Sequence, residues 1–261
     1  MSSKSSDLDA RMKKYEPTEQ FMGRLPIIAR LDGRAFSSFT KKLQRPYDAA
    51  FGLCMCETAQ YLVKQFHATL AHTQSDEITL LFDYTETDPS NMFCGGRPFK
   101  MVSLLAAAAT AKFNQAMRLH LPDYLAYDDL TISLPEMDCR VYQLPNKAEA
   151  TNVFLWRAQD CVRNSVQMLA HATYSHKQCE NKSVRDLLTM LDRDGINWAD
   201  YPDHFREGTY FRRRPQAFMT PLGDPYTRTV VAAIQYHKFG SYTNREQVVF
   251  DDAEPTKLQT E

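Results

Sequence analysis

The alternation of two side-chain periodicities between residues 26 and 144 restricts the folds that this chain can adopt. Residues 26–32 alternate apolar and polar side chains with a period of two, which is typical of a half-buried strand. A segment with helical spacing of apolar residues follows at 46–67, where Pro46 suits the start of a helix. The chain then continues as strand, strand, helix and strand, over residues 68–74, 78–84, 99–117 and 129–144.

This order, β-α-β-β-α-β, predicts an α+β fold whose core has the ferredoxin-like, or split βαβ, arrangement. In that topology the first and third strands are central neighbours. The end of the first strand, at Asp32, then lies beside the turn between the second and third strands, which carries Asp76 and Glu77. The sequence therefore predicts that these carboxylates meet at one end of the sheet.

The second half of the chain has a different character. A long amphipathic helix is expected over 153–175 and a shorter one over 183–193, and turn-rich sequence then leads into a strand-like, basic segment. No linker rich in Pro, Gly or Ser separates the halves. We expect a catalytic core over 1–135 and an appended, mostly helical C-terminal lobe over 136–261, packed together as one unit.

The bulk composition narrows the classes of function. The formal net charge is −1, so any nucleic-acid site must be a local basic patch rather than a global field. No apolar run reaches the roughly 18 residues that a membrane span needs. The six cysteines include no CxxC pair, and the N-terminus is polar. These features predict a soluble, intracellular protein with reduced thiols and no membrane partner.

Carboxylates that lie close together repel one another unless a cation cancels their charge. Mg²⁺ binds in proteins through one or two carboxylates plus substrate phosphates, and two such ions can clamp a phosphoryl displacement. Asp32 and Asp76 could hold both ions, and Gly33 lets its carbonyl approach them because it has no Cβ. A solvated turn is the better explanation of residues 75–77 when they are taken alone, and their expected position beside Asp32 reverses that preference. The residues by themselves indicate only a metal-dependent site.

The motifs around these acids resemble a known family. The motif "RLDGRAF" at 30–36 is followed by "QSDE" at 74–77, and Arg45, Pro46 and Asp48 lie between them. Together with further blocks between residues 8 and 215, this pattern resembles the tRNA-His guanylyltransferase superfamily. The resemblance implies a palm like that of ordinary polymerases, in an enzyme that extends RNA at its 5′ end. A 5′-monophosphate would be activated with ATP, and the 3′-hydroxyl of an incoming nucleotide, such as GTP, would then attack it.

The resemblance also implies roles for individual residues. Asp32, Gly33 and Asp76 match the positions that bind two Mg²⁺ ions, and Glu77 matches an adjacent essential acid. Nucleotide-binding positions are implied at Arg30, Gly33, Arg34, Ala35, Phe36, Ser37, Arg45, Ser75, Asp76, Lys100 and Ser103. Positions for activation or RNA binding are implied at Arg163, Asn164, Lys182, Asn197, Arg212 and Arg213.

One departure separates this chain from the eukaryotic branch of the family. That branch carries "HINN" in the long helix, where this chain reads "VRNS" at 162–165. The change favours the bacterial and archaeal-type "like" branch, whose members resemble template-dependent enzymes that repair 5′-truncated tRNA. Addition of a single guanosine to tRNA-His and a non-catalytic RNA-binding protein of the same fold remain as alternatives. The resemblance further implies a cytoplasmic homo-tetramer, built as a dimer of dimers.

Overall fold

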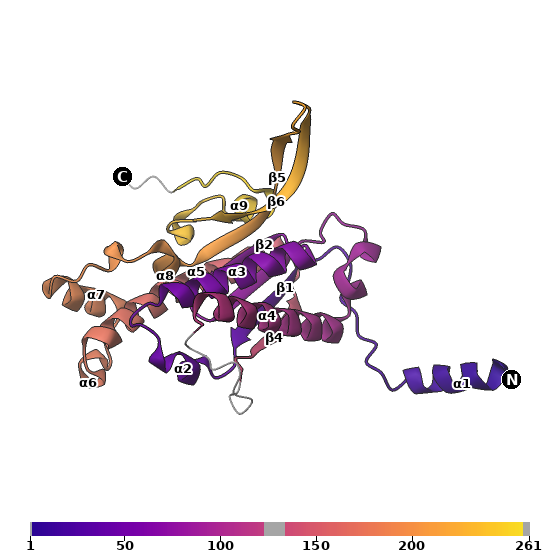
Figure 1. The fold of residues 1–261 in the computed structure, drawn as a ribbon, viewed down its shortest axis with the longest axis horizontal. Helices are drawn as coiled ribbons and strands as arrows, with labels where there is room; N and C mark the ends of the chain where they lie inside the picture. Colours follow the sequence, from indigo (N-terminus) through magenta and orange to yellow (C-terminus); the bar gives the residue numbers. More distant parts are fainter. Residues whose placement is uncertain (1, 123–133, 258–261) are drawn as a thin grey trace.

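The computed structural model describes residues 2–122 and 134–257. Its centre is one antiparallel sheet of six strands in the order β4-β1-β3-β2-β5-β6 (Figure 1). The strands are β1 (Ile27–Gly33), β2 (Leu70–Gln74), β3 (Glu77–Phe82), β4 (Met137–Gln143), β5 (Thr209–Met219) and β6 (Pro225–Ile234). The first four form the predicted ferredoxin-like unit, with β1 and β3 as central neighbours, so the predicted fold class is confirmed.

Alternation along the strands gives the sheet two buried faces. Ile27, Ala29 and Leu31 pack with α3 (Ala49–Phe66) and α4 (Pro98–His120), which lie in front of the sheet in Figure 1. Ile28, on the opposite face, packs with α5 (Lys147–Thr173) and α9 (Arg245–Asp251). Each buried Ile or Leu side chain contributes about 1.5–3 kcal/mol, so helices on both faces stabilise one sheet.

The start of α3 differs from the prediction. The helix begins at Ala49, because the carboxylate of Asp48 accepts the amide of Phe51 at 2.9 Å and so caps the first turn. Pro46 lies before the helix instead of inside its first turn. The part of the last predicted strand at 129–133 lies outside the described residues.

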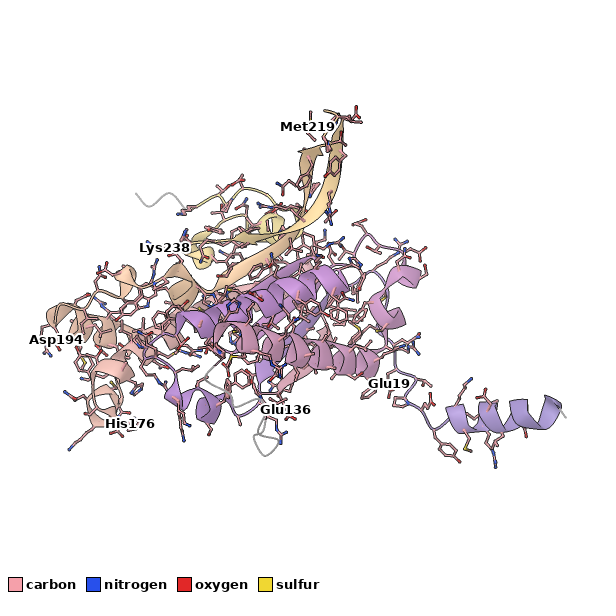
Figure 2. The ribbon with its side chains drawn as sticks, in the orientation of Figure 1. Glu19, Glu136, His176, Asp194, Met219 and Lys238 are labelled. Carbon is pink, nitrogen blue, oxygen red and sulfur yellow. The ribbon has the colours of Figure 1, made fainter. Side chains whose placement is uncertain are left out.

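The sheet continues from the predicted core into the C-terminal part of the chain. β4 begins at Met137, and β5 pairs with β2, with Leu70 opposite Arg212. The division into a core and a lobe at residue 135 stays a prediction. Strands from both sides of that residue are hydrogen-bonded to one another in the same sheet. The β5–β6 hairpin extends beyond the helices, with Met219 near its tip (Figure 2).

Several shorter helices complete the fold. The N-terminal helix α1 extends away from the rest of the molecule, and α6 and α7 lie at the opposite end (Figure 1). No helix within 2–122 and 134–257 is long and apolar enough to cross a membrane. The shorter helices are α1 (Ser2–Lys13), α2 (Phe36–Phe39), α6 (His176–Cys179), α7 (Val184–Arg193) and α8 (Asp203–Glu207).

A buried arginine joins α9 to the sheet. Arg212 on β5 is 3% exposed, and its guanidinium donates to the carbonyls of Val248 and Val249 at 2.7 and 2.5 Å. It also pairs with Asp252 at 3.3 Å. The last carbonyls of a helix have no partner within the helix, so a cation beside them is stabilising. The guanidinium of Arg212 is therefore held inside the fold and is not presented at the surface, so these contacts give no support to its predicted role in RNA binding.

We expect Arg212→Ala to lower the free energy of unfolding by about 3 kcal/mol, because it leaves the carbonyls of Val248 and Val249 without their donor and removes one of the two arginines that pair with Asp252. Arg213→Ala is the matched control, since the neighbouring side chain is only partly buried, and it should cost less than about 0.5 kcal/mol. Urea denaturation of both variants measures the difference. Equal losses would contradict a structural role for Arg212.

Candidate active site

A row of acidic side chains crosses the sheet on the face covered by α5. Asp32 on β1 lies directly opposite Glu77 on β3 and opposite Asp138 on β4. The adjoining β2–β3 turn is tied to the same end, because the amide of Gly33 donates to the carbonyl of Asp76 at 3.1 Å. The structure therefore places Asp32, Asp76 and Glu77 together at one end of the sheet, as the topology predicted.

Arginines surround this acidic row. Directly opposite carboxylates destabilise a sheet unless they are compensated. Arg140 on β4 lies 4.0 Å from Asp32 and 3.6 Å from Asp138, measured from its Nη2 to their Oδ2 atoms. Arg30, which pairs with Arg140 in the register, lies two residues before Asp32 and therefore on the same face. The guanidinium of Arg30 sits over the ring of Trp156 on α5, 5.4 Å from its centroid.

The shortest contact with the acidic row is a buried ion pair. Arg157 on α5 is 4% exposed, and its Nη1 donates to both carboxylate oxygens of Glu77, at 3.1 and 2.9 Å. The same nitrogen lies 3.2 Å from Asp160 Oδ2, and the guanidinium stacks 3.6 Å from the centroid of Trp156. Glu77 is therefore held by α5 and anchors that helix on the sheet.

The electrostatics of the site favour protonation of its acids. Burial raises the pKa of Asp32, and the carboxylate of Asp138 raises it further, while Arg140 and Arg30 oppose the shift. Burial and then the charge of Asp32 raise the pKa of Asp76. Burial also raises the pKa of Glu77, although Arg157 opposes this. Ionisation of such buried acids costs free energy, and a bound cation would offset that cost.

Asp32 and Asp76 have the donor chemistry that Mg²⁺ requires. Both offer carboxylate oxygens, and the charge of Asp32 acts directly on Asp76. Glu77 is engaged by Arg157 and so fits a supporting role better than a direct ligand role. Within the described ranges, the group of three potential ligands whose atoms lie within 4.8 Å of one another is a different one, namely Asp203, Glu207 and His237.

That second group is better explained as an internal salt bridge. His237 Nδ1 lies 2.9 Å from Glu207 Oε2, and the other oxygen of Glu207 accepts the amide of Lys238 at 3.0 Å. Asp203 is bound by Arg206. The carboxylates therefore already have partners, and the contacts hold α8 to the chain that follows β6.

A cavity of about 290 Å³ opens beside the acids. It lies at the start of α3 and is closed on the other side by α5 and α8. Apolar walls with a few polar groups suit a nucleoside with its phosphates. Six residues predicted to bind nucleotide or RNA line it, namely Phe36, Ser37, Arg45, Ser75, Asp76 and Asn164. The same cavity is also lined by Tyr47, Phe51, Ser165, His204 and Phe205.

Local backbone geometry shapes the two motifs around the cavity. A Cβ on Gly33 would lie 2.3 Å from the ring of Phe36, so only glycine permits this packing. Phe36 is 2% exposed and contacts the rings of Phe39, Phe51 and Phe113. Ala35 and Ser75 adopt left-handed φ angles of 57° and 49°.

Some predicted site residues lie elsewhere. Lys100 and Ser103 are exposed on α4, and the Ser103 hydroxyl donates to the carbonyl of Lys100. Thr110 on the same helix meets Met137 at the acidic end of the sheet, so Lys100 lies about 15 Å away along the helix axis. The structure therefore does not bring Lys100 or Ser103 to the acids.

The remaining predicted residues lie at the surface. Arg34 pairs with Glu136 at 2.6 Å, and Arg163 pairs with Asp160. Lys182 is exposed after α6, and Asn197 caps the following turn by accepting the amide of Ala199 at 3.0 Å. The next residue, Trp198, donates its Nε1 to Ser165 Oγ at 3.1 Å, so the Asn197 turn contacts the wall of the cavity.

Three residues of the acidic site were not predicted from the sequence, namely Asp138, Arg140 and Arg157. Asp138 occupies the position on β4 that faces Asp32. The alternation of polar and apolar residues in "EMDCRV" is the sequence feature that could have indicated this position. Arg157 lies on the buried side of an amphipathic helix, where an ionised side chain needs a partner. That position indicates a buried pair but does not identify Glu77 as its partner.

The N-terminal half of the chain matches the model of a known protein family. The model of the family described as tRNAHis guanylyltransferase, Thg1, matches residues 9–145. The chain belongs to the tRNAHis guanylyltransferase family. Its members are nucleotidyltransferases, and this chain is accordingly a nucleotide-binding transferase of tRNA processing that acts at the tRNA 5′ end.

Individual relatives of the chain show how far the similarity extends. An uncharacterized protein of Acanthamoeba polyphaga mimivirus is 29% identical over 222 residues, covering 78% of this chain and 76% of that protein. The tRNA(His) guanylyltransferase of Schizosaccharomyces pombe is 24% identical over 218 residues, covering 78% of this chain and 79% of that protein.

Solved structures extend the family comparison. A bacterial tRNA(His) guanylyltransferase-like protein in complex with ATP superposes with a TM-score of 0.71 and 28% identity, covering 88% of this chain and 91% of that chain. Its counterpart in complex with GTP gives 0.67 and 28%, covering 85% and 90%.

We expect Arg157→Met to lower the free energy of unfolding by about 3 kcal/mol near neutral pH, because Glu77 is left charged, buried and unpaired. The loss should shrink as the pH falls, since a protonated Glu77 needs no counter-charge. The double variant Arg157→Met with Glu77→Gln should recover most of the loss. Urea denaturation at two pH values measures this, and additive losses in the double variant would contradict the pairing.

Asp32→Asn should stabilise the protein in EDTA at pH 7.5, raising the melting temperature by about 1–2 °C. An acid with a raised native pKa makes stability fall as the pH rises through its titration range, and Asn removes that loss. The gain should vanish below the ordinary pKa of Asp. Asp9→Asn on α1 is the control, and a destabilised Asp32 variant would count against the electrostatic account.

Proposed function

We propose that this protein is a Mg²⁺-dependent 3′–5′ nucleotidyltransferase that repairs 5′-truncated tRNA. The observation that carries the proposal is the meeting of Asp32 and Asp76 beside a cavity lined by Ser75 and Arg45. Relatives that bind ATP and GTP support it, because both steps of the reaction use a nucleoside triphosphate.

The reaction has two displacements at phosphorus. An oxygen of the tRNA 5′-phosphate attacks the α-phosphorus of ATP, and pyrophosphate leaves. The 3′-hydroxyl of an incoming nucleotide then attacks the activated 5′-phosphorus, its proton is lost, and AMP leaves. Two Mg²⁺ ions, when bound, would polarise the phosphoryl oxygens and assist deprotonation of the attacking hydroxyl.

The residues of this chain supply positioning. Asp32 and Asp76 would hold the ions, with the Gly33 backbone beside them. Glu77, fixed by Arg157, would keep the sheet and α5 in register and so keep the cavity open next to the acids. Arg30, held over Trp156, lies on the same face as Asp32, where its charge would meet a triphosphate.

The segment "VRNS" favours repair over strict guanylylation of tRNA-His. Two of its residues, Asn164 and Ser165, line the cavity, whereas Arg163 lies at the surface. A role beside the nucleotide suits an enzyme that selects the added base by pairing with the opposite RNA strand. The named curated relatives favour the alternative, single-guanosine addition to tRNA-His. The intact set of acids argues against a non-catalytic RNA-binding protein.

We expect the protein to extend a 5′-monophosphorylated tRNA that lacks its first nucleotide, given ATP, labelled nucleoside triphosphates and Mg²⁺. Asp76→Ala should reduce the rate at least roughly 10³-fold, equivalent to about 4 kcal/mol. Asp9→Ala on the exposed helix α1 is the control and should be neutral. Absence of 5′ growth in the unchanged protein, or equal growth with Asp76→Ala, would refute the proposal.

Exchanging the tRNA separates repair from guanylylation. A repair enzyme should extend several truncated tRNAs within about tenfold of one another and should add the base that pairs with the opposite strand. Changing that opposite base should change the added nucleotide, as read by sequencing of the product. Addition of guanosine to tRNA-His alone, whatever the opposite base, would establish the alternative.

Tetramer formation and a cytoplasmic location are implied by the family resemblance and stay predictions. The described single chain carries the whole acidic row and the cavity beside it. A second copy is therefore not needed to bring the acids together.

A further inference from the structure

A second groove lies on the other side of the sheet from the acidic row. Its volume is about 690 Å³, and it runs between the C-terminal half of α3 and the β5–β6 hairpin. Phe211 and Val231 from the hairpin pack in the same core cluster as α3, which places the groove on that face. It is lined among others by Gln60, Tyr61, Lys64, Arg213, Phe218 and Arg228.

The groove is strongly basic although the chain as a whole is not. Within the ranges that the structure describes, no carboxylate forms an ion pair with Lys64, Arg213 or Arg228. The acid of the groove, Glu57, is already engaged by Lys112 at 2.9 Å and His120 at 2.6 Å. In a chain with a formal net charge of −1, three uncompensated cations in one groove point to an anionic partner.

The position of the groove relative to the cavity suggests which anion it meets. Helix α3 reaches both, because Gly52 lines the cavity and Lys64 lines the groove. Twelve residues of helix separate these positions by about 18 Å. A ligand that enters both must be long and charged along its length. The β5–β6 hairpin, which forms one side of the groove, extends beyond the helices (Figure 1).

We propose that this groove binds the sugar–phosphate backbone of the RNA substrate, away from the 5′ end that reacts. The inference rests on the proposed function, which makes tRNA the substrate. Lys64, Arg213 and Arg228 would each neutralise a phosphate, which gives affinity without reading sequence. Tyr61 is 36% exposed and offers an aromatic edge beside the backbone. Such binding suits an enzyme that accepts many tRNAs.

The triple variant Lys64→Ala, Arg213→Ala and Arg228→Ala tests the groove. Its affinity for tRNA should fall about 10- to 100-fold at moderate salt, and the slope of log affinity against log salt should decrease by about 2–3. Fluorescence anisotropy across a salt series gives both quantities. Lys257→Ala is the control, because that exposed lysine does not line the groove. Unchanged affinity and slope in the triple variant overturn the proposal.

A shortened substrate locates the contact. On a 5′-phosphorylated hairpin whose stem is shorter than the span between cavity and groove, wild-type and variant affinities should converge. An equal loss on the short hairpin would place the lost contact at the reacting end and overturn the proposal. Light scattering adds a further check, because a change in mass in the variant would make the groove an interface between copies.

Measuring binding and 5′ extension separately keeps the two proposals apart. If the unchanged protein extends RNA and the triple variant binds tRNA equally well, only the groove assignment fails. If the unchanged protein binds tRNA through the groove but adds no nucleotide, only the proposed reaction fails. If the unchanged protein binds no RNA, both fail.

Discussion

The buried pair between Arg157 and Glu77 is the contact on which the site depends. It joins a helix from the C-terminal half of the chain to a strand of the ferredoxin-like unit, with both oxygens of one carboxylate bound to one guanidinium nitrogen. Asn164 and Ser165 lie two turns further along the same helix, and they reach the cavity because Arg157 fixes the helix against the sheet. A buried pair of this kind specifies one arrangement more than it adds stability.

The acidic row shows how the fold concentrates charge at a chosen place. Antiparallel pairing sets Asp138, Asp32 and Glu77 side by side. Two residues earlier on β1, the same pairing sets Arg30 beside Arg140. The positive charges of Arg30 and Arg140 partly offset the negative charges of the acidic row. The pKa values of Asp32, Asp76 and Glu77 are nevertheless raised, chiefly by burial. Ionisation of these acids therefore costs free energy, which a bound divalent cation would offset.

Much of this arrangement could be predicted from the sequence because it follows from local periodicity and topology. The strand ending at Asp32 and the turn carrying Asp76 are both evident, and the split βαβ order brings them together. The partner of Glu77 could not be predicted, because a helical period does not say where along the sheet a helix will rest. Three consecutive arginines at 212–214 are equally ambiguous in sequence, and the structure buries Arg212 beneath α9. Lys100 follows a family motif, but the length of α4 carries it away from the acids.

The continuity of the sheet has a consequence for how the molecule comes apart. β2 is hydrogen-bonded to β3 on one side and to β5 on the other, so a strand of the N-terminal half is the inner neighbour of the C-terminal hairpin. Neither half can leave without exposing the edges of a broken ladder to water. A protease cut between the halves would therefore nick the polypeptide without releasing a fragment, and melting would proceed as a single cooperative transition.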